Sequence, residues 1–491
     1  MNQTTRPRLL QVMMRNTGWL YVAEALPRLS GLLIVPIWSS RVAPEEYARW
    51  ILAFTSAEVL LGIGDLGFAS FLTKVLYRYH DDRAQRYFGM GALVVLAATA
   101  LGAGAMAVCS PWLSRAVIGG DVRSDLFVFV GLYVILAQCT NMAILYLSTR
   151  VKYARYFVLM SCRWLLNSSL LLFFLLVRHQ GFYSWVWAAV GTETLLLPLS
   201  GSALRQVWGQ RAPRRILAFA FRFSLPSWTT NFLLSGQSRI GRYLLSFGGV
   251  STGLGLYGIA QNLARSYGVM VRPTKLVAQQ LVGHALEEDA ESPYFLEFFH
   301  SFASIALVIA FLMALFLGDA MKLFVSSSYW AAAAALPALI FTAHLEEISS
   351  LYHSLMFRYF KVWFHFFGSL IAFPVVIAAT FFLVPRMGFL GAALAQLMGA
   401  LAMVVFAQVY ASKVSWRPFR FAEKMGFVLG AFYVVSAAQR WALPLSSKIL
   451  LALVVLSGYG FFHWHRREEL FPLAAGRLRG VFHRDAERSL V

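Results

Sequence analysis

Long apolar stretches separated by short polar segments recur along the whole of this 491-residue chain. Each stretch holds about 20 residues, enough for an α-helix to cross a hydrocarbon core about 30 Å thick. The pattern predicts about fourteen transmembrane helices, or about twelve if the last two stretches are not inserted. The predicted spans are 17–38, 46–70, 87–109, 125–147, 156–177, 183–204, 217–240, 250–271, 295–317, 331–356, 362–384, 388–411, 420–438 and 446–464.

The composition places the chain among the all-α, polytopic membrane proteins. Hydrophobic residues make up 59% of the chain, charged residues only 13%, and the mean hydropathy is +0.62. Soluble domains carry about 25% charged residues. The connections are too short for a soluble catalytic domain, and no Walker glycine loop, GxSxG, HExxH or Cys/His metal spacing occurs. We therefore predict no catalytic residue, metal or cofactor, and expect any energy coupling to use a proton or sodium gradient.

Basic residues are distributed unevenly between the two sides of the predicted membrane. The N-terminus, the even-to-odd connections and the C-terminal tail hold most of the 43 Lys and Arg residues. Because Lys and Arg accumulate in cytoplasmic loops, both termini are predicted to be cytoplasmic. The net charge of +20 therefore reflects topology and contact with anionic lipid, and it does not indicate nucleic-acid binding.

Several arginines lie inside or at the ends of predicted spans. An arginine at the centre of a membrane helix costs about 2.5 to 3.5 kcal/mol, so such residues reach to an edge or face a polar cavity. Arg222 begins the seventh span and Arg242 lies near its outer end, where both can reach the interface. Arg239, one turn deeper, and Arg265, two-thirds along the eighth span, are harder to explain in that way.

Acidic residues concentrate in the first two predicted spans. Glu24 and Arg28 share one face of the first helix, and Glu58 and Asp65 share one face of the second. The short connection makes these helices antiparallel neighbours, so a polar cluster between them is geometrically feasible. The alternative is that Glu24 and Arg28 neutralise each other and lock two helices together.

A second polar group lies in the tenth predicted span. Glu346 and Glu347 occur there with His344 and His353. Adjacent glutamates point in different directions on a helix, so they do not face one small site together. Hydrogen bonding between helices and a proton relay are the two interpretations, and the first is favoured.

Three stretches resemble the polysaccharide transporter, or Wzx-type O-antigen flippase, family of the multidrug/oligosaccharidyl-lipid/polysaccharide exporter (MOP) superfamily. The first is SGLLIVPIWSSRVAPEEYARW followed by LLGIGDLGFASFLTKVL, and the second is FSLPSWTTNFLLSGQSRIGRYLLSFGGVSTGLGLYGIAQNLA. The third is VPRMGFLGAALAQLMGA, similar to a late helix of that family. Each motif is weak alone, being mostly small and apolar residues, but their order and spacing match over most of the chain.

The resemblance implies an architecture of two pseudo-symmetric bundles, each of six helices, around a cavity that opens alternately to either side. On this basis the chain divides into an N-terminal bundle at 1–208 and a C-terminal bundle at 209–412. Two additional spans at 413–465 and a basic cytoplasmic tail at 466–491 follow.

The resemblance also implies a function: flipping of a polyprenyl-pyrophosphate-linked oligosaccharide across the bacterial inner membrane. The product would be an O-antigen, an exopolysaccharide or another surface polysaccharide, with polymerase or export machinery as partners. A pyrophosphate needs a cationic cavity, and guanidinium groups offer bidentate donors to phosphate oxygens. The candidate headgroup ligands are Arg28, Arg239, Arg265, Arg242 and Arg222.

Other residues are assigned roles by the same reasoning. Aromatic rings stack on sugar faces, and the candidates for sugar contact are Trp228, Tyr243 and Tyr257. Packing and interfacial belts remain the alternative for each ring. The candidates for binding a coupling proton or sodium ion are Glu24, Glu58 and Asp65.

Two other functions remain open at this stage. A cation-coupled multidrug exporter of the same superfamily predicts an acidic cavity for cationic drugs, and the surplus of arginine in the seventh span argues against it. A flippase for a pyrophosphate predicts a cationic cavity. A membrane glycan polymerase or ligase would need a substantial external loop for its catalytic residues, and the sequence has no such loop.

Overall fold

The computed structural model describes residues 34–78, 82–118, 124–150, 152–205, 207, 214–246, 252–271, 293–358, 363–413 and 421–465. The described residues form helices and short connections, with no strand among them. Most of the first predicted span, with Glu24 and Arg28, lies outside this part of the chain.

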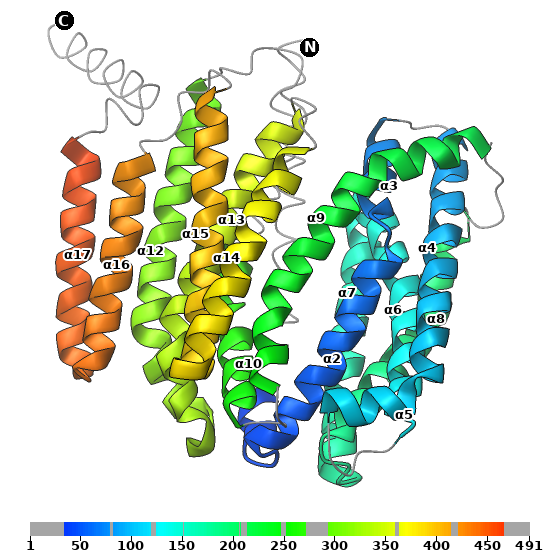
Figure 1. Cartoon of the computed structure of the whole chain (residues 1–491), viewed down its shortest axis with the longest axis horizontal. Helices are drawn as coiled ribbons and strands as arrows, with labels where there is room; N and C mark the ends of the chain where they lie inside the picture. The colour runs from blue at the N-terminus through cyan, green and yellow to red at the C-terminus, as the bar shows by residue number, and fades with distance from the viewer. Residues whose placement is uncertain are drawn as a thin grey trace, which may run out of the picture.

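The helices form two groups that stand side by side (Figure 1). The first group is made of α2 (Pro44–Gly64), α3 (Phe68–Arg78), α4 (Asp82–Val108), α5 (Ser110–Leu113), the π-helical turn η1 (Ser114–Ile118), α6 (Leu126–Thr149), α7 (Tyr153–Leu172), η2 (Phe173–Val177) and α8 (Tyr183–Leu204). The second contains α10 (Thr252–Ala264), α12 (Pro293–Phe324), the 3-10 helix η4 (Ser327–Ala335), α13 (Leu336–Arg358), α14 (Trp363–Met387), α15 (Phe389–Lys413), α16 (Phe421–Arg440) and α17 (Leu445–His465). The long helix α9 (Arg214–Ser246) runs obliquely between them.

The all-α membrane fold predicted from the sequence is confirmed. Every predicted span after the first coincides with described helix, and eight of the described helices are long and apolar enough to cross a membrane. The helices α2 and α9 are not among these eight, and both carry charged residues along their length. Charge on a membrane helix is expected where the helix faces the protein interior.

Two predicted spans are interrupted in the structure. The second is divided at Leu66 and Gly67, whose φ angles of 50° and 71° belong to the left-handed region. The carboxylate of Asp65 accepts hydrogen bonds from the backbone N–H groups of Gly67 and Ala69, so it serves the start of α3. The eighth is broken at Arg265, which occupies the turn after α10.

Close helix packing joins the two groups at the end of the molecule where α2 begins, opposite the C-terminal end of α17 (Figure 1). A Cβ atom on Gly255 of α10 would collide with the backbone oxygen of Pro44, which begins α2. Thr252 donates a hydrogen bond to Glu45, and Asn262 donates one to Tyr47. Only glycine allows this approach of two backbones.

An aromatic cluster fills the same end of the molecule. Trp38 lies 4.4 Å from Tyr47 between ring centroids, and Trp50 lies 4.2 Å from Trp185. The hydroxyl of Tyr329 in η4 donates a hydrogen bond of 2.9 Å to the carbonyl of Val42. These residues come from both groups of helices, so this end of the junction is sealed by packed side chains.

The N-terminal part of α9 packs on the first group instead. The indole N–H of Trp228 donates to the carbonyl oxygen of Ile63 at 3.3 Å, and Phe221 packs edge-on against Phe68 with ring centroids 5.0 Å apart. The C-terminal part of α9 packs on α14 and α15. The helix therefore contacts both groups, and α9 and α2 together line the junction.

The glycine contact between α10 and α2 generates a stability prediction. Gly255→Ala forces the two backbones apart, and overpacking of this kind costs about 1 to 3 kcal/mol. Gly430→Ala on α16 is the matched control, since nothing lies within 4 Å of its added methyl group. Alanine favours a helix over glycine by about 1 kcal/mol, so the control should be neutral or stabilising. Thermal unfolding of the purified protein in detergent checks this prediction. An unchanged midpoint for Gly255→Ala would show that α2 and α10 move apart at no measurable cost in stability.

Candidate functional site

A cavity of about 680 Å³ lies between the two groups of helices. Its described wall comes from α2, α9, α10, α13, α14 and α15, together with the turn after α10. Polar side chains dominate this wall, in contrast to the apolar outer surface of the helices. The polar lining residues are Glu58, Ser235, Gln237, Ser238, Gln261, Arg265, Thr342, Glu346, Glu347, Ser349, Ser350 and Gln396.

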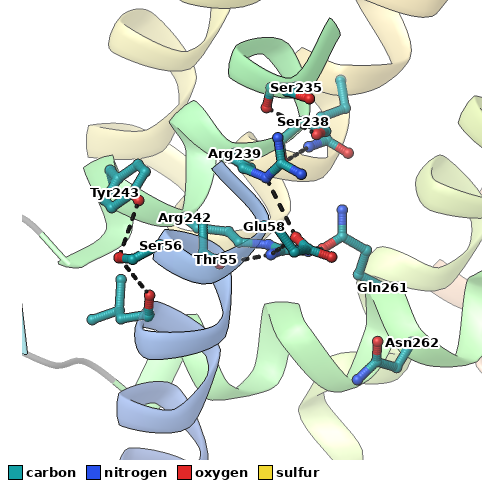
Figure 2. Close-up of polar contacts among 12 residues, drawn as sticks. Thr55, Ser56, Glu58, Ser235, Ser238, Arg239, Arg242, Tyr243, Gln261 and Asn262 are labelled. Atoms are coloured by element: carbon teal, nitrogen blue, oxygen red, sulfur yellow. Dashed lines mark hydrogen bonds and ion pairs between the residues drawn. The ribbon is translucent and has the colours of Figure 1, made fainter. Parts of the chain in front are cut away.

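A charge network at one side of the cavity links α2 with α9 and α10 (Figure 2). Arg242 is 5% exposed, and its Nη1 lies 2.7 Å from Thr55 Oγ1 and 3.4 Å from Glu58 Oε2. Its Nε and Nη2 donate to Gln261 Oε1 at 3.0 and 2.5 Å. Arg239 Nε lies 3.3 Å from the same Glu58 oxygen. One carboxylate oxygen therefore serves two guanidinium groups.

Helical spacing explains how the network forms. Arg239 and Arg242 are three positions apart on α9, so their side chains leave the helix on one face. Thr55 and Glu58 have the same spacing on α2. Because α2 and α9 pack against each other, the two faces meet and the opposite charges pair.

Arg239 keeps donor capacity beyond its contact with Glu58. Its Nη1 atom is buried and has no hydrogen-bond partner among the described residues. A buried donor without a partner costs about 1 to 3 kcal/mol. The network is therefore able to accept a further anionic or oxygen-bearing group at this atom.

The ionisable residues of the cavity wall are more acidic than basic in the described part of the chain. Glu58, Glu346 and Glu347 line the cavity, and Arg265 is the basic residue among them. Arg239 and Arg242 are bonded to Glu58 but are not part of the lining. The carboxylate of Glu58 thus faces the cavity, and the two guanidinium groups contact it without lining the cavity.

Hydroxyl and amide groups complete the wall, and they were not singled out from the sequence. Ser235, Ser238, Gln237 and Gln396 line the cavity, and the Gln396 amide donates to the Ser238 carbonyl at 2.9 Å. Such groups suit a hydroxyl-rich cargo. The signal in the sequence was the set of polar positions that recur every three or four residues along α9, ending at Arg242.

The other charged residues expected at the site lie in different places. Arg265 is exposed and lines the cavity. Arg222 is exposed on the first half of α9 and belongs neither to the lining nor to the described contacts of the network. Asp65 caps the junction of α2 and α3, away from the network.

The aromatic residues expected to contact sugar do not line the described cavity. Trp228 bonds to the backbone of α2, Tyr243 lies with its hydroxyl 3.5 Å from Ser56 Oγ, and Tyr257 is fully buried. Sugar contact by these three residues stays a prediction that needs another conformation of the helices.

A buried ion pair inside the first group is a further feature. Arg163 Nη2 of α7 lies 2.5 Å from Glu193 Oε1 of α8, and Arg163 Nη1 donates to Asn141 Oδ1 of α6 at 3.1 Å. Glu193 is 2% exposed. The pair joins three helices of one group, which indicates a structural role.

His344 forms a comparable link in the second group. The ring Nδ1 of His344 lies 2.9 Å from the hydroxyl oxygen of Tyr267, and that hydroxyl lies 3.2 Å from the carbonyl oxygen of Ala306. The favoured interpretation, hydrogen bonding between helices, is therefore observed for His344. The side chain of His353 lies outside the described part of the chain.

The shared carboxylate predicts a measurable coupling between α2 and α9. Removing one partner of a buried ion pair leaves the other charge uncompensated. In a double-mutant cycle of Glu58→Ala and Arg242→Ala we expect a coupling energy of about 1 to 3 kcal/mol, measured by unfolding in detergent. A parallel cycle of Glu58→Ala with Arg222→Ala should give about zero, because these residues share no contact. Equal coupling in both cycles would contradict the direct pairing.

Comparisons with known proteins identify the fold. No protein-family model matches the sequence, and no curated protein matches it. Among solved structures, the lipid II flippase MurJ in an inward closed conformation superposes with a TM-score of 0.66 at 11% identity, over 92% of this chain and 99% of MurJ.

Two other solved structures are transporters of the MATE family. The Vibrio cholerae MATE transporter VcmN, in a mutant form, gives a TM-score of 0.60 at 16% identity, over 84% of this chain and 98% of its own. An inward-facing multidrug resistance MATE transporter of the MOP superfamily gives a TM-score of 0.62 at 14% identity, over 82% of this chain and 97% of its own. The chain is thus a polytopic membrane protein with the fold shared by MurJ and the MATE transporters.

Proposed function

We propose that this chain is an alternating-access flippase that moves a polyprenyl-pyrophosphate-linked oligosaccharide across the bacterial inner membrane. The observation that carries the proposal is the arginine pair of α9, which lies at the junction of the two helix groups and holds an unsatisfied buried donor on Arg239. The cargo would be a precursor of an exported polysaccharide such as an O-antigen or exopolysaccharide.

The chemistry of the cargo fits this site. A pyrophosphate cannot enter an apolar membrane interior without charge-assisted hydrogen bonds, because burying an unpaired anion is very costly. Guanidinium groups supply such bonds in a planar arrangement. The serine and glutamine side chains of the cavity wall would then hydrogen-bond the sugar hydroxyls.

The architecture supports a lipid-linked cargo. MurJ is described as a lipid II flippase, and it matches a larger share of this chain, 92%, than the two MATE transporters at 84% and 82%. The last two helices, α16 and α17, lie at the outer edge of the second group, beyond α12 (Figure 1).

The closed end of the junction is consistent with one step of a transport cycle. If the even-to-odd connections are cytoplasmic, as the distribution of basic residues predicts, the α2–α10 contact and the aromatic cluster would lie at the extracytoplasmic end. The described conformation would then take up cargo from the cytoplasmic side. Glu58 is the residue best placed to couple an ion or proton to the arginine pair, because it contacts both arginines.

Export of organic cations is the second candidate function, and one observation favours it. The described cavity wall holds three carboxylates and one guanidinium, an arrangement that suits a positively charged cargo. Two of the similar structures are MATE transporters, one of them described as a multidrug resistance protein.

The flippase proposal is tested in a strain that lacks the gene. We expect a lipid-linked glycan to accumulate, and mass spectrometry of extracted lipids would give its mass. The wild-type gene and Arg222→Ala should clear it, whereas Arg239→Ala at equal protein level should not. If Arg239→Ala clears the lipid-linked glycan, Arg239 does not bind the anionic headgroup. If no lipid-linked glycan accumulates in the strain that lacks the gene, the proposed cargo is contradicted.

The exporter alternative is tested with purified protein in liposomes. The flippase proposal predicts no uptake of a cationic dye such as ethidium when a proton or sodium gradient is imposed. Uptake that depends on the gradient and is lost in Glu346→Gln would overturn the proposal in favour of cation export. Glu193→Gln is unsuitable as a control because it breaks a buried pair, so Glu46→Gln, in the first turn of α2 and outside the described cavity lining, serves instead.

A further inference from the structure

A second cavity, of about 750 Å³, lies in the second helix group and shares no lining residue with the central one. It is formed where the C-terminal end of α12 and the helix η4 meet the hairpin of α16 and α17. We call it the hairpin cavity. The turn between α16 and α17 lies toward the lower left of Figure 1.

The hairpin cavity carries an excess of positive charge. Lys322 of α12 and Arg440 of α16 line it and are exposed, while Lys448 of α17 is buried. Lys448 Nζ lies 2.6 Å from Asp319 Oδ2, so these two charges compensate each other. Lys322 and Arg440 therefore remain as net cations facing the cavity.

The backbone of α17 adds to this field. The helix begins at Leu445 beside the cavity and runs for 21 residues, and the partial positive charge at a helix N-terminus attracts anions. The helix dipole and the side-chain cations thus both attract an anion to the cavity. The dipole alone would not define a site, but the two cations that line one cavity do.

Apart from Ser436 and Gln439, the rest of the cavity wall is apolar. Leu390 and Leu394 of α15, Phe432 of α16 and Leu443 lie along it. Trp330, which lines the cavity, and Trp441, next to Arg440, are 43% and 71% exposed. Exposed tryptophans mark the level of the membrane–water interface. The cavity therefore combines cations at headgroup depth with a wall suited to acyl chains.

We propose that the hairpin cavity binds the phosphate headgroup of an anionic membrane phospholipid, held by Lys322 and Arg440. The ligand would bridge α12 and α16 and so fasten the α16–α17 hairpin to the second helix group. This site is separate from the transport cavity, and the inference does not depend on the proposed cargo.

The experiment compares three ligands on the purified full-length protein. Dioleoylphosphatidylglycerol, dioleoylphosphatidylcholine and inorganic phosphate are each titrated in detergent while the midpoint of thermal unfolding is recorded. Phosphatidylglycerol should raise the midpoint at low concentration, because a ligand that binds only the folded state stabilises it. The double variant Lys322→Ala/Arg440→Ala should need about tenfold more of this lipid for the same rise, since loss of charge-assisted bonds costs at least about 1.4 kcal/mol.

Arg178→Ala is the matched control, because Arg178 is an exposed cation at the end of η2 in the first group and lines neither cavity. Phosphatidylglycerol should raise the unfolding midpoint of Arg178→Ala by as much as it raises that of the wild type. Lys448 is not substituted, because its removal would leave the Asp319 carboxylate without its ion-pair partner. An unchanged midpoint for the double variant in phosphatidylcholine shows that it folds. Equal responses to both lipids, an equal response to free phosphate, or an unaltered response of the double variant would each overturn the lipid site.

Discussion

The Arg242 guanidinium, buried where α2, α9 and α10 meet, is the constraint on which the centre of this structure depends. A charge in that position persists only if its donors are satisfied, and here Thr55, Glu58 and Gln261 supply the acceptors. Because Thr55 and Glu58 belong to one helix group and Gln261 to the other, the solvation of this arginine requires both groups. Moving the two helix groups apart would remove some of the hydrogen-bond acceptors of Arg242.

The remaining contacts between the groups differ along the junction. At one end the approach of Gly255 to Pro44 and the aromatic cluster exclude water and leave no room for a ligand. At the level of Arg242 the contacts are polar, and beyond them lies the cavity. Ring contacts and hydrogen bonds within the protein close the first end. At the centre the Nη1 atom of Arg239 keeps an unused donor, so this is the part of the junction that can take up a further polar group.

Hydrophobic length and periodicity predicted the helices well, because each span must satisfy its own backbone in the membrane. The same signal could not show that Asp65 would cap a break between α2 and α3, or that Arg265 would fall on a turn, since both depend on local backbone geometry. For the site, the sequence singled out Arg239 and Arg242 as two arginines one turn apart in the seventh span. It could not reveal that Glu58 would pair with both, because that pairing depends on which helices meet. The sequence also suggested a cationic cavity, and the carboxylates of α13 at its wall were not anticipated as lining residues.

The position of Glu58 bears on how an acidic wall could serve the proposed anionic cargo. Its carboxylate contacts Arg239 and Arg242 in the described conformation, which reduces the cost of burying these charges, while the Nη1 atom of Arg239 keeps an unused donor. A pyrophosphate bound at this donor would compete with the Glu58 carboxylate for the two guanidinium groups and so would weaken the ionic contact between α2 and α9. Cargo binding and separation of the helices would then share one set of donors, which is the differential interaction that a conformational change requires. A cationic cargo would instead contact Glu58 from the cavity side and weaken its hold on the arginines. Both cargoes act on the same bond, and the identity of the group that replaces it decides between the two functions.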